Sequence, residues 1–389
     1  MDTIPYARQD INQEDIDAAI AVLSSDFLTQ GPMVPAFEKA VMDYCGSQYA
    51  IAVNSATSAL HIACLALGVC KGDVVWTSPI TFVASANCAL YCDATIDFVD
   101  IDPLTYNLSI EKLVEKLAFA ESIGNLPKVL ICVHLSGQSC DMSAIHKLSK
   151  QYKFKIIEDA SHAIGGKYKN NAIGNCHFSD ITVFSFHPVK IITTGEGGMA
   201  VTNDITLAKE MRLLRSHGIS AEKLDFEARP MQEIWNYQQI KLGFNYRMTD
   251  IGAALGLSQM NRLDEFVSKR NAIAKRYNDL LSNLPLVTPF QHEDSYSSYH
   301  LYIIRLKLNE IKKTQRQIFE EIYAAGILIN LHYIPIYRQP YFRKIGFKSD
   351  YCQQADKYYS EAISIPMYSG LTIEQQNNVI SVISEAVQI

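Results

Sequence analysis

The chain has 389 residues, of which 48% are hydrophobic and 20% charged, as in globular proteins with a sizeable buried core. A net charge of −6 gives no reason to expect nucleic acid or an anionic membrane as a partner. The first residues of the sequence show no basic segment followed by an apolar one, and no apolar run approaches the about 20 residues that span a bilayer, so we expect a cytoplasmic protein. The nine cysteines form no CxxC pair, which predicts reduced core cysteines and no metal site.

The predicted elements begin with an extended arm (residues 1–11) and an amphipathic helix from Glu14 to Leu23, capped by Asn12. Strand and helix patterns then alternate, which predicts a mainly parallel sheet with helices on both faces. We expect strands at residues 50–53, 74–77, 95–99, 128–133, 155–158, 181–186 and 198–201, and helices at 58–67, 82–91, 110–117 and 142–152.

After residue 249 the pattern changes to one long helical stretch, predicted from Thr249 through Leu281. A strand (300–306), a helix (314–325), a short strand (328–331) and a final helix (373–387) follow, and they predict a smaller α+β unit. The segment 220–239 is polar and aperiodic, so we expect a surface insertion there. The expected divisions are an N-terminal arm (1–13), a large domain (14–250) and a small C-terminal domain (251–389).

Lys190 ends an apolar run that starts at Ile181, and three glycines follow within residues 195–198. Burial at such a strand end favours a neutral amine, which a Schiff-base lysine requires. A second strand, from Lys155, ends on Asp159. Together the pair indicates pyridoxal phosphate, with the lysine for its aldehyde and the carboxylate for its pyridinium nitrogen. For either residue alone, a snorkelling lysine or a helix-capping aspartate is the simpler interpretation.

The segment Asn54–Leu60 follows a strand and opens a helix with small residues, so its backbone amides can approach an anion. Ala56 and Thr57 are the predicted phosphate contacts, and simple capping by Ser55 or Thr57 is the alternative. The chain has no GxGxxG and no GxxxxGK[ST] motif, which argues against dinucleotides and nucleoside triphosphates.

Three further residues are candidates for the same site. Phe82 stands at a strand-to-helix junction, where an aromatic ring can lie on a cofactor ring or simply join the core. His162 could touch the cofactor's phenolic oxygen or the Asp159 carboxylate, with a structural histidine as the alternative. Ser185 precedes Lys190 by five residues, and a bend before Pro188 could bring its hydroxyl to the phosphate.

A loop at Gly243–Asp250 precedes the long helix, and Thr249 is its predicted N-cap. Asn245 and Arg247 are separated by one residue, so in an extended segment their side chains point the same way. Such a pair suits a phosphate or a carboxylate. A surface loop that meets only water is the alternative.

With these residues in place, the chain resembles the DegT/DnrJ/EryC1/StrS aminotransferases, which transfer amino groups to nucleotide sugars. The resemblance runs from about Ile4 to Val387 and implies the type I pyridoxal-phosphate fold, an α/β three-layer sandwich like that of aspartate aminotransferase. The motifs that carry it are FLTQGP (27–32), NSATSAL (54–60), SPITFVA (78–84), EDASHA (158–163), SFHPVKIITTGEGG (185–198), RSHG (215–218), FNYRMTD (244–250) and HYIPIY (332–337).

The resemblance implies a role for each matching residue. Lys190 would form the Schiff base and Asp159 would pair with the pyridinium nitrogen. The other implied cofactor residues are Phe82, Ala56, Thr57, His162, Ser185 and, from the other subunit of a homodimer with shared active sites, Asn245. The implied sugar-nucleotide residues are Tyr6, Asp26, Phe27, Leu28, Thr29, Arg247, His332, Ile336, Tyr337, Arg338 and Gln339. Many members of the family have Gly at the position of Ala56 and Gln at that of His162, which leaves the role of His162 open.

The implied reaction moves the amino group of L-glutamate to C4 of a UDP-4-keto-6-deoxy sugar, with UDP-2-acetamido-2,6-dideoxy-β-L-arabino-4-hexulose as the expected acceptor. The expected alternatives are another nucleotide 4-keto sugar of the bacillosamine or perosamine type, and a non-enzymatic binding protein on the same fold. A third class on this fold removes a C3 hydroxyl and has His at the lysine position, so Lys190 argues against it.

Overall fold

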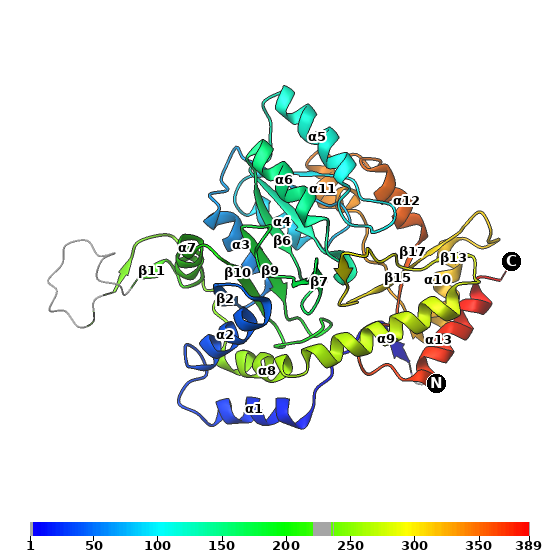
Figure 1. Cartoon of the computed structure of the whole chain (residues 1–389), viewed down its shortest axis with the longest axis horizontal. Coiled ribbons are helices and arrows are strands. Elements are labelled where there is room, and N and C mark those ends of the chain that lie inside the picture. The colour runs from blue at the N-terminus through cyan, green and yellow to red at the C-terminus, as the bar shows by residue number, and fades with distance from the viewer. Residues whose placement is uncertain (1–2, 221–234, 236, 389) are drawn as a thin grey trace.

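A computed structural model gives the fold, and it describes residues 3–220, 235 and 237–388. Its largest sheet has seven strands, which span Tyr49–Val53 (β2), Val74–Thr77 (β3), Thr95–Phe98 (β4), Val129–Val133 (β5), Lys155–Asp159 (β6), Ile181–Ser185 (β9) and Gly198–Thr202 (β10). The strand order is β2-β10-β9-β6-β5-β3-β4. Figure 1 labels β2, β10, β9 and β6 of this sheet. β10 runs antiparallel to both neighbours, and all other adjacent pairs are parallel.

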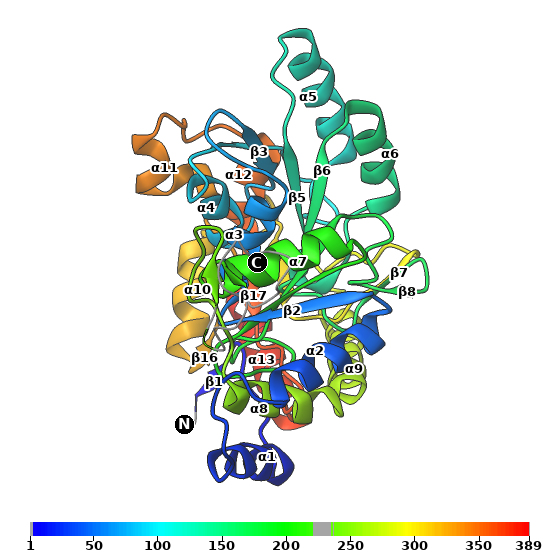
Figure 2. The ribbon, with the colours of Figure 1, turned by 90° about the vertical axis from the view of Figure 1, so that its left-hand side faces the viewer.

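Helices cover both faces of this sheet, so the large part of the molecule has three layers (Figure 2). The side chains of Ile51, Val129 and Ile157 lie on one face of the sheet. They form a hydrophobic core with apolar residues of α3 (Ala56–Ala66), α4 (Ala84–Leu90) and α7 (Ile205–Arg215). The opposite face carries Ala52, Leu130 and Ile156, covered by α2 (Met33–Cys45), α5 (Ile110–Ser122) and α6 (Met142–Tyr152). Because side chains alternate along a strand, Asp159 and Ile157 lie on the α3 face and Glu158 on the other.

A smaller sheet follows toward the C-terminus, with strand order β13-β15-β17. Its core brings together apolar residues of the sheet with those of α9, α10 and α13, and Ile4 of the N-terminal arm joins it. The arm enters as strand β1 (Ile4–Pro5), which pairs in parallel with β16 (Ile327–Leu328). The remaining bounds are Leu286–Val287 (β13), Tyr302–Leu306 (β15), Ala362–Ile365 (β17), Leu263–Leu281 (α9), Gln315–Ala324 (α10) and Ile373–Ala386 (α13).

The helical stretch predicted from Thr249 through Leu281 is interrupted. α8 (Asp250–Met260) ends at Asn261, and α9 begins after Arg262. The Arg262 guanidinium forms ion pairs with Asp10 at 2.9 Å and Asp15 at 2.6 Å, which ties the break to the N-terminal helix α1 (Gln13–Leu23). α8 packs on α1 and α2 (Figure 1). The division of the chain at residue 250 stays a prediction.

The predicted alternation in the large sheet is confirmed, including the Asn12 cap of α1 and the Thr249 cap of α8. The strand predicted at 328–331 is shorter and begins earlier, because only Ile327 and Leu328 pair with the arm. Several elements have no predicted counterpart. They include the strands β13 and β17 of the smaller sheet, the helices α2, α7, α11 (Pro340–Lys344) and α12 (Gln353–Glu361), the 3₁₀ turns Leu135–Gly137 (η1) and Ile336–Arg338 (η3), and a small sheet of β7 (Lys167–Tyr168), β8 (Asn171–Ala172) and β14 (Ser295–Tyr296).

Most of the predicted insertion at 220–239 lies outside the described residues, which exclude 221–234 and 236. At its base β11 (Ile219–Ser220) pairs with β12 (Gln238–Gln239). All nine cysteines are unpaired, and every one except Cys70 is buried. Within the described ranges, no helix has the length and apolar character needed to cross a membrane. The same ranges hold no group of three or more His, Cys, Asp or Glu side chains able to bind a metal ion.

Candidate active site

Lys190 and Asp159 extend from neighbouring strands of the large sheet. β6 ends at Asp159, whose register partner on β9 is Val183, and Lys190 follows β9 by five residues. Burial lowers the pKa of the Lys190 amine to about 8, and the nearby Asp159 carboxylate partly opposes this shift. The direction of this shift agrees with the expectation that burial at this strand end favours the neutral amine.

The Asp159 carboxylate is buried and held on both oxygens. Ser85 on α4 donates its hydroxyl to Oδ2 at 2.6 Å, and the Ser161 amide donates to Oδ1 at 3.1 Å. Thr81 lies 2.8 Å from the Ser85 hydroxyl and extends this chain of contacts. Because both oxygens have fixed partners, the carboxylate has one orientation. The sequence contains Ser85 three residues after Phe82, but nothing in its local pattern indicated a contact with Asp159.

The N-terminus of α3 lies directly against strand β10. A Cβ on Gly198 would lie 2.4 Å from the Ala56 nitrogen and 2.4 Å from the carbonyl carbon of Ser55, so only glycine fits there. Ser185 is the register partner of Gly198 on the neighbouring strand. The first-turn amides of Ala56 and Thr57 have no acceptor inside the helix, as at every helix start. The structure thus brings the three predicted phosphate residues to one place.

Phe82 is 58% exposed, so the alternative that it belongs to the core is wrong. Its ring centroid lies 6.3 Å from that of Tyr333, a residue that the sequence had not singled out. Tyr333 stands in the motif HYIPIY next to His332, and its neighbours in that motif were predicted instead. An exposed aromatic face beside Asp159 and Lys190 is suited to cover a planar cofactor ring.

Three buried histidines surround the lysine. His162 lies 4.3 Å from the His300 ring, and burial together with the Lys190 charge lowers the pKa of His162, His300 and His332, that of His332 to about 3. His332 bonds through Nδ1 to the Ser364 hydroxyl at 2.8 Å, and its ring lies 5.3 Å from that of Tyr6. These imidazoles are therefore neutral. Tyr6 and His332 lie close to each other, and their binding of the sugar nucleotide stays a prediction.

His162 has two partners in the chain. The Ser136 amide donates to its Nδ1 at 3.2 Å, and the Tyr333 hydroxyl lies 3.1 Å from its Nε2. No hydrogen bond between His162 and Asp159 occurs among the described residues. The predicted contact with the Asp159 carboxylate is therefore wrong in this structure, because both ring nitrogens already have other partners.

The segment Ile336–Gln339 does not bring its first two side chains to the lysine. Ile336 and Tyr337 are fully buried, and Tyr337 donates its hydroxyl to Asp356 at 2.6 Å. Arg338 donates to the same carboxylate at 2.8 Å, and Gln339 precedes α11. The 3₁₀ turn directs the Ile336 and Tyr337 side chains into the core toward α12, so these side chains do not face the lysine. That the segment Ile336–Gln339 lines the sugar-nucleotide pocket stays a prediction.

The other predicted substrate residues lie near the start of α8. Asp26, Phe27, Leu28 and Thr29 are exposed, and the Leu28 carbonyl accepts from the Asp250 amide at 3.0 Å. Arg247 lines a cavity of about 350 Å³ with Asn54 and Thr194, and contacts His217 at 3.5 Å. Asn245 is exposed, and its side-chain amide has no hydrogen-bond partner within the part of the chain that the structure describes. Its predicted action across a dimer stays a prediction.

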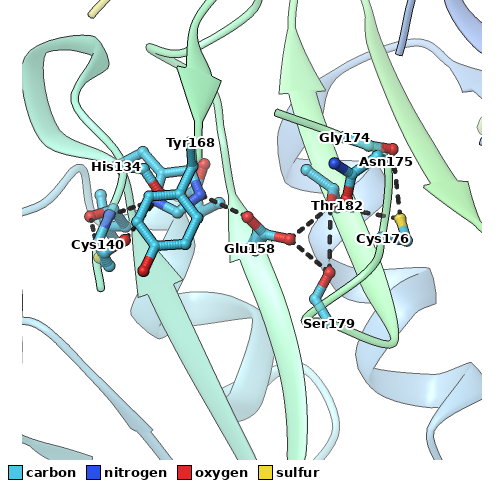
Figure 3. A network of polar contacts seen from close by, with 12 residues as sticks. His134, Cys140, Glu158, Tyr168, Gly174, Asn175, Cys176, Ser179 and Thr182 are labelled. Carbon is cyan, nitrogen blue, oxygen red and sulfur yellow. Dashed lines mark hydrogen bonds and ion pairs between the residues drawn. The ribbon is translucent and has the colours of Figure 1, made fainter. Parts of the chain in front are cut away.

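Glu158, on the other face of β6, anchors a second polar network (Figure 3). It accepts from His134 at 2.7 Å, Ser179 at 2.5 Å and Thr182 at 3.1 Å. Burial alone would raise the pKa of Glu158, but these hydrogen bonds lower it below its usual value. The Cys140 amide donates to His134 Nδ1 at 3.1 Å. The network joins the ends of β5, β6 and β9, and so supports the strand end that carries Asp159.

Taken together, the fold and the site define an enzyme of the Schiff-base lysine class, built on a three-layer α/β sandwich. The residues present fit pyridoxal phosphate, with a glycine-lined helix start for its phosphate, a fixed carboxylate, an exposed aromatic face and a half-buried lysine amine of lowered pKa.

Comparison with known proteins agrees with this class. The profile of the DegT/DnrJ/EryC1/StrS aminotransferase family matches residues 9–384. The chain is 38% identical over 373 residues to the UDP-4-amino-4,6-dideoxy-N-acetyl-β-L-altrosamine transaminase of Campylobacter jejuni (serotype O:23/36, strain 81-176), covering 95% of this chain and 94% of that protein. It is 35% identical over 356 residues to the GDP-perosamine synthase of Caulobacter vibrioides, covering 91% and 90%.

A solved structure of Helicobacter pylori PseC, an aminotransferase involved in the biosynthesis of pseudoaminic acid, superposes with a TM-score of 0.90 at 31% identity over 99% of both chains. The chain therefore belongs to the DegT/DnrJ/EryC1/StrS aminotransferase family. It has the type I fold, and it is an enzyme that uses pyridoxal phosphate to transfer an amino group to a sugar.

Proposed function

We propose that the protein transfers the amino group of L-glutamate to C4 of a UDP-4-keto-6-deoxy-N-acetylhexosamine, namely UDP-2-acetamido-2,6-dideoxy-β-L-arabino-4-hexulose, in pseudaminic acid biosynthesis. The observation that carries the chemistry is the half-buried Lys190 amine, with its pKa lowered to about 8, next to the fixed Asp159 carboxylate. Similarity to the Campylobacter jejuni transaminase and to PseC supports the choice of sugar.

Pyridoxal phosphate, when bound, supplies an electron sink for the bond that breaks at the amino-bearing carbon. Asp159 keeps a proton on the pyridine nitrogen, and Ser85 and Ser161 hold the carboxylate in place for this task. Lys190 would take the proton from Cα of the amino donor as a base and then, as the conjugate acid, deliver it to the C4′ carbon of the cofactor, which requires a neutral amine in part of the cycle. Ala56, Thr57 and Ser185 would hold the phosphate, and Phe82 would cover the ring.

The substrate is placed by residues around the lysine in this proposal. Tyr6 and His332, whose rings lie 5.3 Å apart, would contact the substrate, as would the exposed segment Asp26–Thr29 and Arg247. Arg338 and Gln339 contribute from the segment that precedes α11. Misplacing a reacting carbon by about an ångström can cost on the order of a hundredfold in rate, so a pocket shaped for the β-L sugar disfavours its α-D counterpart.

A second candidate function is C4 amination of another nucleotide 4-keto sugar, and similarity to the GDP-perosamine synthase favours it. Incubation of the purified protein with glutamate and each nucleotide 4-keto sugar, followed by NMR of the product, separates the two. A preference in kcat/KM for the β-L-arabino sugar supports our proposal, whereas equal or better use of the α-D-xylo sugar or of a GDP sugar assigns the second function.

We further propose that the active form is a cytoplasmic homodimer whose two sites each use Asn245 of the other subunit. A stripe of exposed apolar side chains on α1 (Ile16, Ile20 and Leu23) continues into Phe27 and Leu28, and such a surface suits a protein partner. The exposed Asn245 amide, free of partners among the described residues, is available for a contact across that interface.

A further inference from the structure

The hydrogen bonds of His162 define where its proton lies. A backbone N–H can only donate, so the Ser136 amide at 3.2 Å makes Nδ1 an acceptor without a proton. Burial, the Lys190 charge and His332 lower the pKa of His162 well below its usual value, so the ring is neutral and carries its single proton on Nε2. His162 is therefore the donor in its 3.1 Å contact with the Tyr333 hydroxyl.

This polarity leaves the proton of the Tyr333 hydroxyl without an acceptor. Its oxygen already accepts from His162, and no other hydrogen bond of this hydroxyl exists within the described chain. Burial, together with Asp159 and Tyr6, raises the pKa of Tyr333 above its usual range, so the phenol stays protonated at every physiological pH. The Tyr333 hydroxyl is therefore protonated and its oxygen accepts from His162, so its own proton is available to an acceptor outside the protein chain.

The position of Tyr333 indicates where the acceptor of its hydroxyl proton lies. Its ring stacks on His162 with centroids 6.2 Å apart and an interplanar angle of 25°, and it lies 6.3 Å from the exposed ring of Phe82. The preceding residue, His332, is fixed by Ser364 and by the Tyr358 hydroxyl, which donates to its carbonyl at 2.5 Å. Tyr333 is thus held from the C-terminal part of the chain, at the edge of the space between Phe82 and Asp159.

We propose that Tyr333 is a ligand-binding residue of this site, which donates its hydroxyl to an anionic or carbonyl oxygen of the bound cofactor or substrate, and that His162 is a positioning residue that acts only through Tyr333. The inference rests on the proposed function for the presence of such a ligand. It also explains why a histidine can stand at position 162. Both nitrogens of His162 contact groups of the protein, Ser136 and Tyr333, and the ligand contacts Tyr333.

A double-mutant cycle with Tyr333→Phe and His162→Leu tests the coupling. Two readouts are needed. The first is cofactor binding, measured as the dissociation constant of pyridoxal phosphate and as the pH midpoint of the visible absorption of the loaded protein. The second is KM for the sugar and for glutamate. Loss of one neutral hydrogen bond should weaken the affected quantity by about two- to tenfold in Tyr333→Phe. His162→Leu should produce a similar factor, and the double variant should be no worse than Tyr333→Phe alone.

The two readouts distinguish the source of the oxygen. A changed cofactor dissociation constant or absorption midpoint assigns the cofactor oxygen, and it is measured without any sugar, so a wrong choice of sugar does not affect it. Unchanged cofactor binding with a raised KM assigns a substrate oxygen. Tyr323→Phe, which removes an exposed hydroxyl on α10, is the matched control.

Two results would overturn the proposal. One is a Tyr333→Phe variant indistinguishable from Tyr323→Phe in every readout. The other is a double variant whose loss is the product of the single losses, since His162 would then act on the ligand independently. If His162→Leu does not fold, His162→Gln replaces it. The glutamine amide can still donate to Tyr333, so its effect should be smaller than that of Tyr333→Phe and should vanish in the Tyr333→Phe background.

Discussion

Replacing Gly198 by alanine should damage the phosphate site through the backbone of α3. The added Cβ would lie 2.4 Å from both the Ala56 nitrogen and the Ser55 carbonyl carbon, whereas ordinary contacts start at 3.4 Å, so the helix start or β10 must move by about 1 Å. Both obstructing atoms belong to the backbone, and no side chain can rotate away. Overpacking of this kind costs about 1–3 kcal/mol of unfolding free energy.

The same displacement moves the amides that we assign to the phosphate, so the affinity for pyridoxal phosphate should fall. We expect a loss of about tenfold in Kd, which corresponds to about 1.4 kcal/mol of binding free energy. The assays are equilibrium titration with pyridoxal phosphate and denaturant unfolding of the cofactor-free protein. Gly370→Ala is the matched control, because the nearest atom to its added Cβ is 4.0 Å away. A Gly198→Ala protein that loses stability but binds pyridoxal phosphate like the control would refute the assignment of the phosphate to the start of α3.

Three other predictions concern the lysine, the carboxylate and the dimer. In the cofactor-free protein, acylation of Lys190 should accelerate as pH rises through about 8, because its pKa is lowered to that value and only the neutral amine reacts; a midpoint near that of free lysine would contradict the burial argument. Asp159→Asn should bind cofactor but lose most of its single-turnover rate with glutamate, since a neutral amide does not stabilise the pyridinium, and an unchanged rate would exclude this role. Mixing Lys190→Ala with Asn245→Ala subunits should restore part of the activity if Asn245 acts across the dimer, because one of the two sites in the heterodimer is then intact; no recovery after confirmed subunit exchange would place Asn245 in its own chain's site.

The strands of the large sheet and the pair Lys190 and Asp159 could be predicted because their signals are local. Parallel strands buried on both faces are near-continuous apolar runs, and β5 (Val129–Val133) is buried at every position. A charged residue directly after such a run is conspicuous in the sequence. The chemistry of the pair then followed from residue types at two strand ends.

Features held by distant residues could not be predicted in this way. The start of α2 has no side-chain cap of its own, and the fully buried Asp250 accepts instead from the amides of Gly31 at 2.8 Å and Met33 at 2.7 Å. The interruption between α8 and α9 is stabilised by Arg262, which pairs with Asp10 and Asp15. No sequence period reports contacts between residues so far apart.

The remaining errors at the site come from side-chain direction. The motif HYIPIY does not say which of its side chains face the core. Ile336 and Tyr337, in the 3₁₀ turn, are buried in the core, whereas Tyr333, before the turn, lies 6.3 Å from the exposed ring of Phe82. Ser85 was missed for the same reason, since its contact with Asp159 depends on how α4 lies over the sheet.

The most direct test of the central claim follows the nitrogen atom itself. The purified protein is incubated with ¹⁵N-labelled L-glutamate and UDP-2-acetamido-2,6-dideoxy-β-L-arabino-4-hexulose, and the product is examined by NMR, with Lys190→Ala in parallel. Our account predicts ¹⁵N bonded to C4 of the sugar with the wild-type protein and none with the variant. A product without the label, or label transfer by Lys190→Ala at the wild-type rate, would contradict it.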